Sequence, residues 1–285
     1  MDIGEAGAGA ALALSSSVFG GTADFLGGTT SRIVGTVRFM FCTQAAGLLL
    51  AGSWVAISRE PLPDLATLGE ALAAGVSLII SLTAFFQAMV VGTVSIVAPI
   101  SAIGVCVPVA AGVAQGDRLG PAQVLGILAA LAGMLLVARQ ERQHGSLPVR
   151  SSLGLALVAA FGGGVCLWLI AEASRGGVAW TLLVVRAVMA LVLTVALCSR
   201  RISLRRAFER RIAWRVLASV LFGFLGFTLY ALATLHGQLA VVSVLASLYP
   251  VVTVLLAYHL LGERLHRPQQ VGIAAVLLGV VLLSS

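Results

Sequence analysis

Residues 261–283 read LGERLHRPQQVGIAAVLLGVVLL, and residues 115–137 read QGDRLGPAQVLGILAALAGMLLV. Shifted by 146 residues, the two stretches align without a gap, and an acidic residue meets an acidic residue near the start of each. The identical pairs include Gly116 with Gly262, Arg118 with Arg264, Gly126 with Gly272 and Gly133 with Gly279. The chain therefore divides into two related halves, residues 1–145 and residues 146–285.

The composition indicates an integral membrane protein. Of 285 residues, 59% are hydrophobic and 10% are charged, whereas a soluble domain carries about 25% charged residues. A bilayer core of about 30 Å needs roughly 20 apolar residues per helix, and ten runs of this kind are present. They lie near residues 8–28, 34–56, 68–91, 94–115, 121–138, 152–172, 178–198, 212–235, 239–261 and 268–284. We expect an all-α protein with ten transmembrane helices.

Five helices per half mean that the second half enters the membrane from the opposite side. The two halves are then inverted repeats, which can exchange conformations across a pseudo-two-fold axis and expose a site at the midplane alternately to each side. This architecture predicts transport by alternating access.

The arginines predict the orientation. All eighteen basic residues are arginines, and fourteen lie in the loops that join the predicted spans 1 and 2, 5 and 6, 7 and 8, or 9 and 10, or in the first residues of the span that follows such a loop. Loops rich in arginine face the cytoplasm, so both termini should lie outside a cell membrane, either a plasma membrane or a bacterial inner membrane. The net charge of +7 belongs to these loops, and no basic domain predicts binding to nucleic acid.

The second half resembles a known family. Residues 243–283, SVLASLYPVVTVLLAYHLLGERLHRPQQVGIAAVLLGVVLL, are similar to the second copy of an EamA-type transporter of the drug/metabolite transporter superfamily, most specifically from Tyr249 to Gly279. The first copy departs from the pattern, with Gly104 at the place of Pro250. The resemblance implies a secondary transporter, commonly an exporter, of a small metabolite or drug. It would work in the lipid bilayer as a monomer or homodimer, without a cofactor.

Four ionisable residues inside the predicted spans, Asp24, Arg38, Glu172 and Arg186, are candidates for function, because charge within a membrane is costly. A shift of 148 residues aligns the first acid and arginine with the second, and fourteen residues separate acid from arginine in both halves. Hairpins turning near Ser31 and Ala179 would place each acid and its arginine at equal depth. This arrangement predicts two symmetry-related ion pairs, Asp24 with Arg38 and Glu172 with Arg186.

A second alignment competes with the first. Phe-Gly-Gly at residues 19–21 also matches Phe-Gly-Gly at residues 161–163, which sets Asp24 against Cys166. The two alignments exclude each other without a gap, and both stay open at this point.

These ion pairs have two interpretations. In the first, each pair neutralises its charges so that a helix hairpin can insert. In the second, one acid exchanges a proton for the solute, with its protonation set by desolvation and by the arginine. Asp24 is the better candidate for coupling, because the flanking glycines leave space for water or solute.

Polar, aromatic and helix-breaking residues within the spans are candidates for the substrate cavity, because broken helices often build such sites. Small residues also serve tight helix packing, which is the alternative for several of them. The candidates are Gln44, Gln87, Gly104, Pro108, Trp168, Tyr230, Tyr249 and Pro250.

Motifs of soluble enzymes are missing from the sequence. It contains no H-E-x-x-H, no G-x-S-x-G and, without lysine, no P-loop. The four histidines and four cysteines have no metal-ligand spacing. We therefore expect a transporter of a small organic solute, either coupled to protons or not, rather than an enzyme. The alternative is a membrane scaffold that transports nothing.

The orientation leads to a first prediction. A reporter fused after Ser285 should give the signal of an extracytoplasmic location, so alkaline phosphatase should be active there and green fluorescent protein dark. Reporter activity in whole cells measures this. A cytoplasmic signal at Ser285 would refute the orientation derived from the arginines.

Overall fold

The computed structural model of the chain describes residues 3–91, 100–101, 103–137, 149–201, 210–262 and 266–283. Within them the regular structure is helical. The elements are α1 (Ile3–Val34), α2 (Thr36–Ser58), α3 (Leu65–Val91), η1 (Ile103–Val105), α5 (Cys106–Ala114), α6 (Pro121–Val137), α7 (Val149–Gly176), α8 (Val178–Ser199), α9 (Arg210–His236), α10 (Leu239–Ala246), α11 (Tyr249–Leu261) and α12 (Arg267–Leu283). The start of the span predicted at 94–115 and the repeat residues 263–265 lie outside the described residues.

Most of these helices are long and apolar enough to cross a bilayer. Six described segments meet both criteria, and three shorter apolar helices accompany them. The long α1 is not among the six, because its glycine, serine and threonine residues lower its mean hydropathy. The chain is thus the all-helical membrane protein that its composition predicts.

One predicted span is a broken helix. The span expected at 239–261 consists of α10 and α11, separated by a turn at Ser247 and Leu248. Pro250 occupies the first turn of α11. Proline has no N–H to donate to the preceding helical turn and favours the start of a helix. The break therefore follows from Pro250, and it lies inside the apolar segment.

The two helix hairpins that carry the charged residues turn at glycines. Gly35 separates α1 from α2 with a φ of 90°, and Gly177 separates α7 from α8 with a φ of 150°. These φ values favour glycine, because a Cβ is strained in this region. The turns lie at Gly35 and Gly177 rather than near Ser31 and Ala179, where the sequence analysis placed them.

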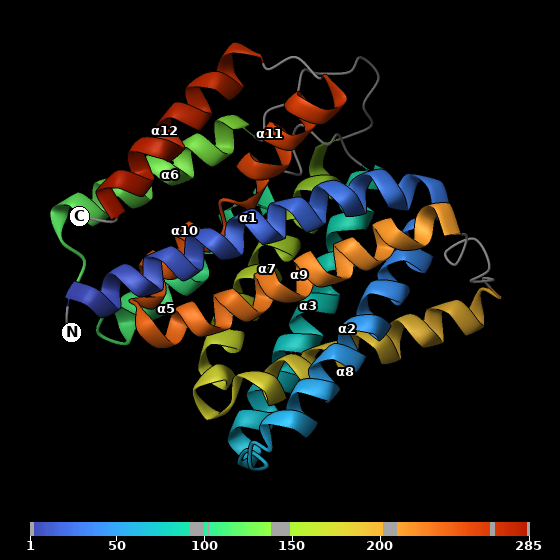
Figure 1. Cartoon of the computed structure of the whole chain (residues 1–285). Coiled ribbons are helices and arrows are strands. Elements are labelled where there is room, and N and C mark those ends of the chain that lie inside the picture. The colour runs from blue at the N-terminus through green and yellow to red at the C-terminus, as the bar shows by residue number, and fades with distance from the viewer. Residues whose placement is uncertain are drawn as a thin grey trace.

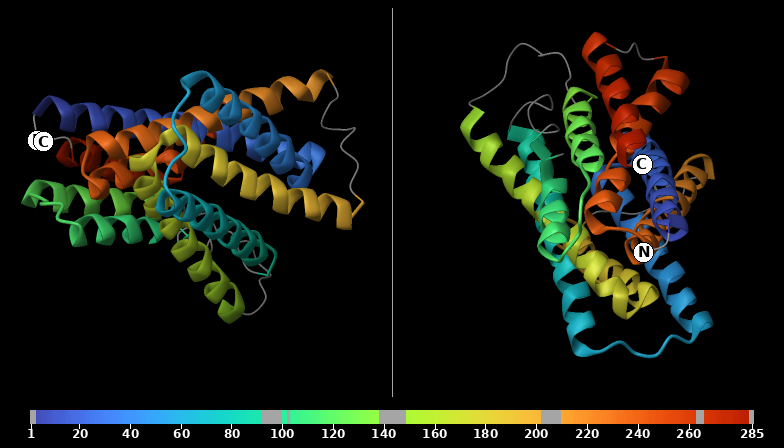
Figure 2. Two further views of the ribbon diagram at one scale, coloured as in Figure 1. Left: turned by 90° about the horizontal axis from the view of Figure 1, so that it is seen from below. Right: turned by 90° about the vertical axis from the view of Figure 1, so that its left-hand side faces the viewer.

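Helices of the first half pack mainly against helices of the second half. The most extensive pairings are α3 with α7, α1 with α9, α6 with α12 and α2 with α8. Figure 1 shows α1 running beside α9, and α6 beside α12 at one corner of the molecule. Figure 2 shows the first and last helices bringing the two chain ends to the same end of the molecule.

Serine hydroxyls reinforce two of these interfaces by donating hydrogen bonds to backbone carbonyls of the facing helix. Hydroxyl groups commonly bond across helices in this way within a bilayer. Between α1 and α9 the bonds run from Ser16 to Gly226 (2.7 Å) and from Ser219 to Ala23 (3.1 Å), and between α3 and α7 from Ser77 to Gly162 (2.8 Å) and from Ser81 to Ala159 (2.7 Å).

Four glycines bring α6 and α12 into backbone contact. A Cβ at Gly133 would lie 2.6 Å from the carbonyl oxygen of Gly272, and a Cβ at Gly279 would lie 2.8 Å from that of Gly126. These are the glycines that align between the two halves of the sequence. Without a hydrophobic force between helices in lipid, such close approach is a main source of association.

The loop before α3 ends in a helix cap. The backbone N–H of Thr67 donates a 3.0 Å hydrogen bond to Oδ1 of Asp64. Hydrogen bonds from Thr67 hold the pKa of the exposed Asp64 carboxyl below its usual value, because they stabilise the charged form. An aspartate at this position satisfies a backbone donor at the start of the helix.

The glycine contacts between α6 and α12 give a second prediction. The Gly133→Ala variant should lower the free energy of unfolding by about 1–3 kcal/mol, because the new methyl group would force two backbones apart. Thermal or denaturant unfolding of the purified protein in detergent measures this. Gly69→Ala in α3 is the control, since a Cβ there would meet nothing within 4 Å. Equal stability of the two variants would contradict the packing described.

Candidate functional site

The Arg186 guanidinium lies buried among α8, α2 and α9. Arg186 is only 8% exposed. Its Nη1 donates a 3.1 Å hydrogen bond to Oε1 of Gln44 on α2. Its Cζ lies over two aromatic rings of α9, 5.3 Å from the ring centre of Phe224 and 5.9 Å from that of Phe227. The predicted need of Gln44 for a polar partner is thus met by an arginine from the other half of the chain.

The neighbouring glycine makes room for this side chain. A Cβ at Gly47, one helical turn from Gln44, would collide with the Arg186 guanidinium. The Nε atom of Arg186 is buried and has no hydrogen-bond partner among the described residues. Aromatic faces offset part of the cost of burying a cation, but they do not satisfy its N–H donors.

Asp24 faces the interior from α1. Ala23 lies against Gly223 of α9, while Gly21 lies against the backbone of Tyr249 on α11. At 3.6 residues per turn, position 24 falls between these two directions, about 60° from residue 21 and about 100° from residue 23. The carboxylate therefore points between α9 and α11.

The Asp24 residue is accessible and not enclosed by packing. Asp24 is exposed although it points inward, and a Cβ at Gly28, one turn further along α1, would meet nothing within 4 Å. Tyr249, at the start of α11, is 42% exposed and lies within electrostatic reach of Asp24. The start of α11 and the acid thus lie close to each other.

The turn positions explain why Asp24 does not lie level with Arg38. Asp24 lies eleven residues before Gly35 and Arg38 only three after it, so their depths below the turn are about 16 Å and about 5 Å. Nη1 of Arg38 donates a 2.9 Å hydrogen bond to the carbonyl of Val34, across the turn. Arg38 therefore belongs to the end of the hairpin and Asp24 to its interior.

Glu172 and Arg186 are not brought together either. Glu172 lies five residues before Gly177, or about 8 Å below the turn, and Arg186 lies nine residues after it, or about 14 Å. Oε2 of Glu172 pairs instead with Nη1 of Arg175 at 2.8 Å. Equal spacing along the sequence did not predict equal depth, and it carried no information about the direction of each side chain around its helix.

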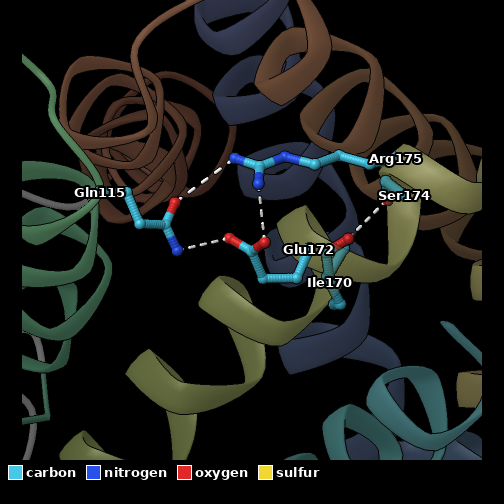
Figure 3. Close-up of polar contacts among 5 residues, drawn as sticks. All are labelled: Gln115, Ile170, Glu172, Ser174 and Arg175. Atoms are coloured by element: carbon cyan, nitrogen blue, oxygen red, sulfur yellow. Dashed lines mark hydrogen bonds and ion pairs between the residues drawn. The ribbon is translucent and has the colours of Figure 1, made fainter. Parts of the chain in front are cut away.

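Glu172 joins two helix ends. Its Oε1 accepts a 2.7 Å hydrogen bond from Nε2 of Gln115, which follows α5, while Arg175 also donates to Oε1 of Gln115. Figure 3 shows the three side chains closing a triangle between α5 and α7. On the same helix, the Ser174 hydroxyl donates to the carbonyl of Ile170, one turn earlier. This cluster lies near the surface, because the Arg175 side chain is 58% exposed.

Matching glycine contacts discriminate between the two sequence alignments. A Cβ at Gly21 would meet the carbonyl of Tyr249 and the side chain of Val252, and a Cβ at Gly164 would meet the carbonyl of Gly104 and the side chain of Val107. Both contacts join the helix at the start of a half to the broken span of the other half. Gly21 and Gly164 are 143 residues apart, which is within one residue of the Phe-Gly-Gly alignment and five residues from the alignment of Asp24 with Glu172. This shift sets Asp24 against Leu167 and gives it no acidic counterpart in α7.

Three of the cavity candidates are packed against the protein. A Cβ at Gly104 would collide with the carbonyl of Ala160, and Pro108 is buried. Tyr230 is 2% exposed, and its hydroxyl bonds to the carbonyl of Leu167 and to the hydroxyl of Ser243. These three residues hold helices together.

The remaining candidates have more open surroundings. Gln87 on α3 is exposed, and Pro250 is half-buried at the start of α11. Trp168 is half-buried on α7, and its Nε1 has no hydrogen-bond partner among the described residues. Of these candidates, Tyr249 interacts electrostatically with Asp24.

Sequence reasoning missed the aromatic partners of Arg186. Phe224 and Phe227 stand three residues apart, which puts them on one helix face, but nothing in that spacing indicates which charged residue they meet. Gln115 and Arg175 were missed as partners of Glu172 for a different reason. Only Arg175 is near in sequence, and its i, i+3 spacing is the signal that would have found it.

The contacts of Arg186 give a third prediction. In a double-mutant cycle of Gln44→Leu and Arg186→Met, the coupling free energy should be about 0.5–3 kcal/mol, because the residues share a hydrogen bond. A cycle of Glu172→Gln and Arg186→Met should be additive within about 0.5 kcal/mol. Unfolding of the four variants and the wild type in detergent measures both. Strong coupling in the second cycle would restore the ion pair expected from the sequence.

Comparisons with known proteins agree with this architecture. The family model described as the EamA-like transporter family matches residues 150–285. A solved crystal structure superposes with a TM-score of 0.73 over 97% of this chain and 96% of that chain, at 16% sequence identity, and so shares the fold. No curated protein gives a significant match. The second part of the chain, residues 150–285, is thus similar to the EamA-like transporter family, which belongs to the drug/metabolite transporter superfamily.

Proposed function

We propose that this protein is a secondary active transporter that exports a small organic solute in exchange for protons by alternating access. The observation that carries the proposal is Asp24, an exposed carboxylate between α9 and α11 that lies beside the break between α10 and α11. An ionisable group inside a membrane domain is by default functional, and discontinuous helices often build the sites of secondary transporters.

The packing supports two inverted repeats of five helices, residues 1–145 and 146–285. When η1 is counted with α5, and α10 with α11, the described residues form ten helical segments, which supports ten membrane crossings. A two-fold axis that exchanges α1 with α7 and α3 with α9 turns the α1–α9 interface into the α3–α7 interface, and both are extensive. The same axis maps α2–α8 and α6–α12 onto themselves, and these are the other two main pairings.

Three contacts lie at the end of the molecule where the termini are. They support a state of the transport cycle in which this end is closed. There, Asp117 accepts a 2.9 Å hydrogen bond from the N–H of Ala240, Gln238 donates to the carbonyl of Arg118, and Glu172 binds Gln115. With the termini outside, as the arginines predict, this state is closed to the exterior. Asp24 would then be reached from the cytoplasmic side.

Coupling follows from the position of Asp24. A proton taken up from the exterior in the opposite state would travel inward on this carboxylate and leave at the cytoplasmic side. After the proton has left, the protein binds the solute and carries it outward. Because Asp24 has no acidic counterpart in α7, one carboxylate serves both directions.

A fourth prediction tests the coupling. Asp24→Asn should be expressed and folded, because the neutral amide is easier to bury than the carboxylate, but its pH-driven solute flux should fall at least tenfold because the amide cannot carry a proton. The measurement uses purified protein in liposomes with an imposed pH gradient. Its solute is one first identified by screening a strain that lacks the protein.

Asp64→Asn is the matched control. Asparagine also caps helices, and Asp64 lies exposed in the loop before α3, so flux should stay at the level of the wild type. Full pH-driven flux in Asp24→Asn would overturn the coupling role of Asp24. A wild-type protein that moves no solute under any gradient would favour the scaffold instead.

A further inference from the structure

Among the described residues, no acidic side chain forms an ion pair with Arg186. The ion pair found in the described part of the chain joins Glu172 and Arg175 at a helix end, and the partners of Arg186 are Gln44, Phe224 and Phe227. All three partners are uncharged. A buried cation without an anion costs several kcal/mol even after relaxation, so a purely structural role would be served better by an apolar residue.

The Arg186 guanidinium has N–H donors that could bind a ligand. It carries five N–H groups in a planar fork, and the described residues accept one hydrogen bond, at Oε1 of Gln44. The phenylalanine rings lie under its Cζ and can cover its faces but cannot accept from its edge. The buried and unpartnered Nε lies on that edge.

The chemistry of this site matches a carboxylate. The guanidinium fork binds the two oxygens of a carboxylate in its own plane, and one negative charge neutralises the single positive charge. A phosphate dianion would leave an excess charge in a place lined by Phe224, Phe227 and Trp54, whose ring centre lies 6.3 Å from that of Phe224. These aromatic side chains suit the apolar part of an organic acid.

We propose that Arg186, oriented by Gln44, binds the carboxylate of the solute. This inference deepens the proposed transport function and rests on it. Gly47 is a part of the site, because its missing side chain leaves the space that the guanidinium fills. Arg186 and Asp24 then have separate tasks, with the arginine recognising the solute and the aspartate carrying the proton.

Binding can be measured without transport. The full chain, purified in detergent at constant chloride and ionic strength, is titrated with sodium phenylacetate and, in parallel, with 2-phenylacetamide. The two probes have nearly the same size and the same ring, but only the first is an anion. Phenylacetate should raise the unfolding temperature of the wild type, and isothermal titration should give its dissociation constant, whereas the amide should do neither.

Arg186→Gln should weaken phenylacetate binding about 10- to 100-fold, the loss expected when a charged hydrogen bond is removed. Arg215→Gln is the control, since Arg215 also lies over an aromatic ring, 5.6 Å from the centre of Trp214, and it should bind like the wild type. If Arg186→Gln does not fold, the Gly47→Ala variant is used to test the proposal instead. Its methyl group displaces the guanidinium, while the positive charge remains. It too should weaken binding.

Three results would overturn the proposal. The first is unchanged phenylacetate affinity in the folded Arg186 or Gly47 variant, and the second is equal affinity for the acid and the amide. The third is a wild-type protein that binds no carboxylate probe at all. Binding that is lost in the Arg186 variant, together with no solute flux in liposomes, would instead confirm the carboxylate site and reject the transport function on which it was built.

Discussion

Close approach between helix backbones governs this structure, because apolar side chains gain little by leaving lipid for one another. At Gly133, Gly164 and Gly21 a single added carbon atom would collide with a carbonyl of the facing helix or lie within 2.6 Å of it. Each of these contacts joins one half of the chain to the other. Glycine therefore sets which helices meet, and serine hydroxyls that bond to carbonyls add direction to the contact.

The packing leaves two unlike charged groups inside the protein. Asp24 opens onto space between α9 and α11, whereas Arg186 is enclosed among α2, α8 and α9. Both residues lie beside α9, because Ala23, next to Asp24, touches Gly223, and Arg186 lies over Phe224. A proton carrier has to be reachable by water, and a site that recognises a carboxylate gains strength where water is excluded. The difference in burial fits the different tasks proposed for the two residues.

Sequence reasoning was most accurate where the signal is local. Runs of apolar residues gave the helices, and the aligned glycines of residues 115–137 and 261–283 indicated a contact that α6 and α12 do make. It failed at the hairpins. A regular spacing of fourteen residues suggested two ion pairs, but the turns lie at Gly35 and Gly177, so the depths of acid and arginine differ.

The amino-acid sequence by itself determined that the chain is helical, that it belongs in a membrane and that its halves are related, because hydropathy and repetition are properties of neighbouring residues. Only the tertiary structure decided the partner of each charged group. That partner depends on the direction of a side chain around its helix and on which distant helix lies there. Gln44 and Arg186 stand 142 residues apart, and only the packing of α2 against α8 brings the amide to the guanidinium.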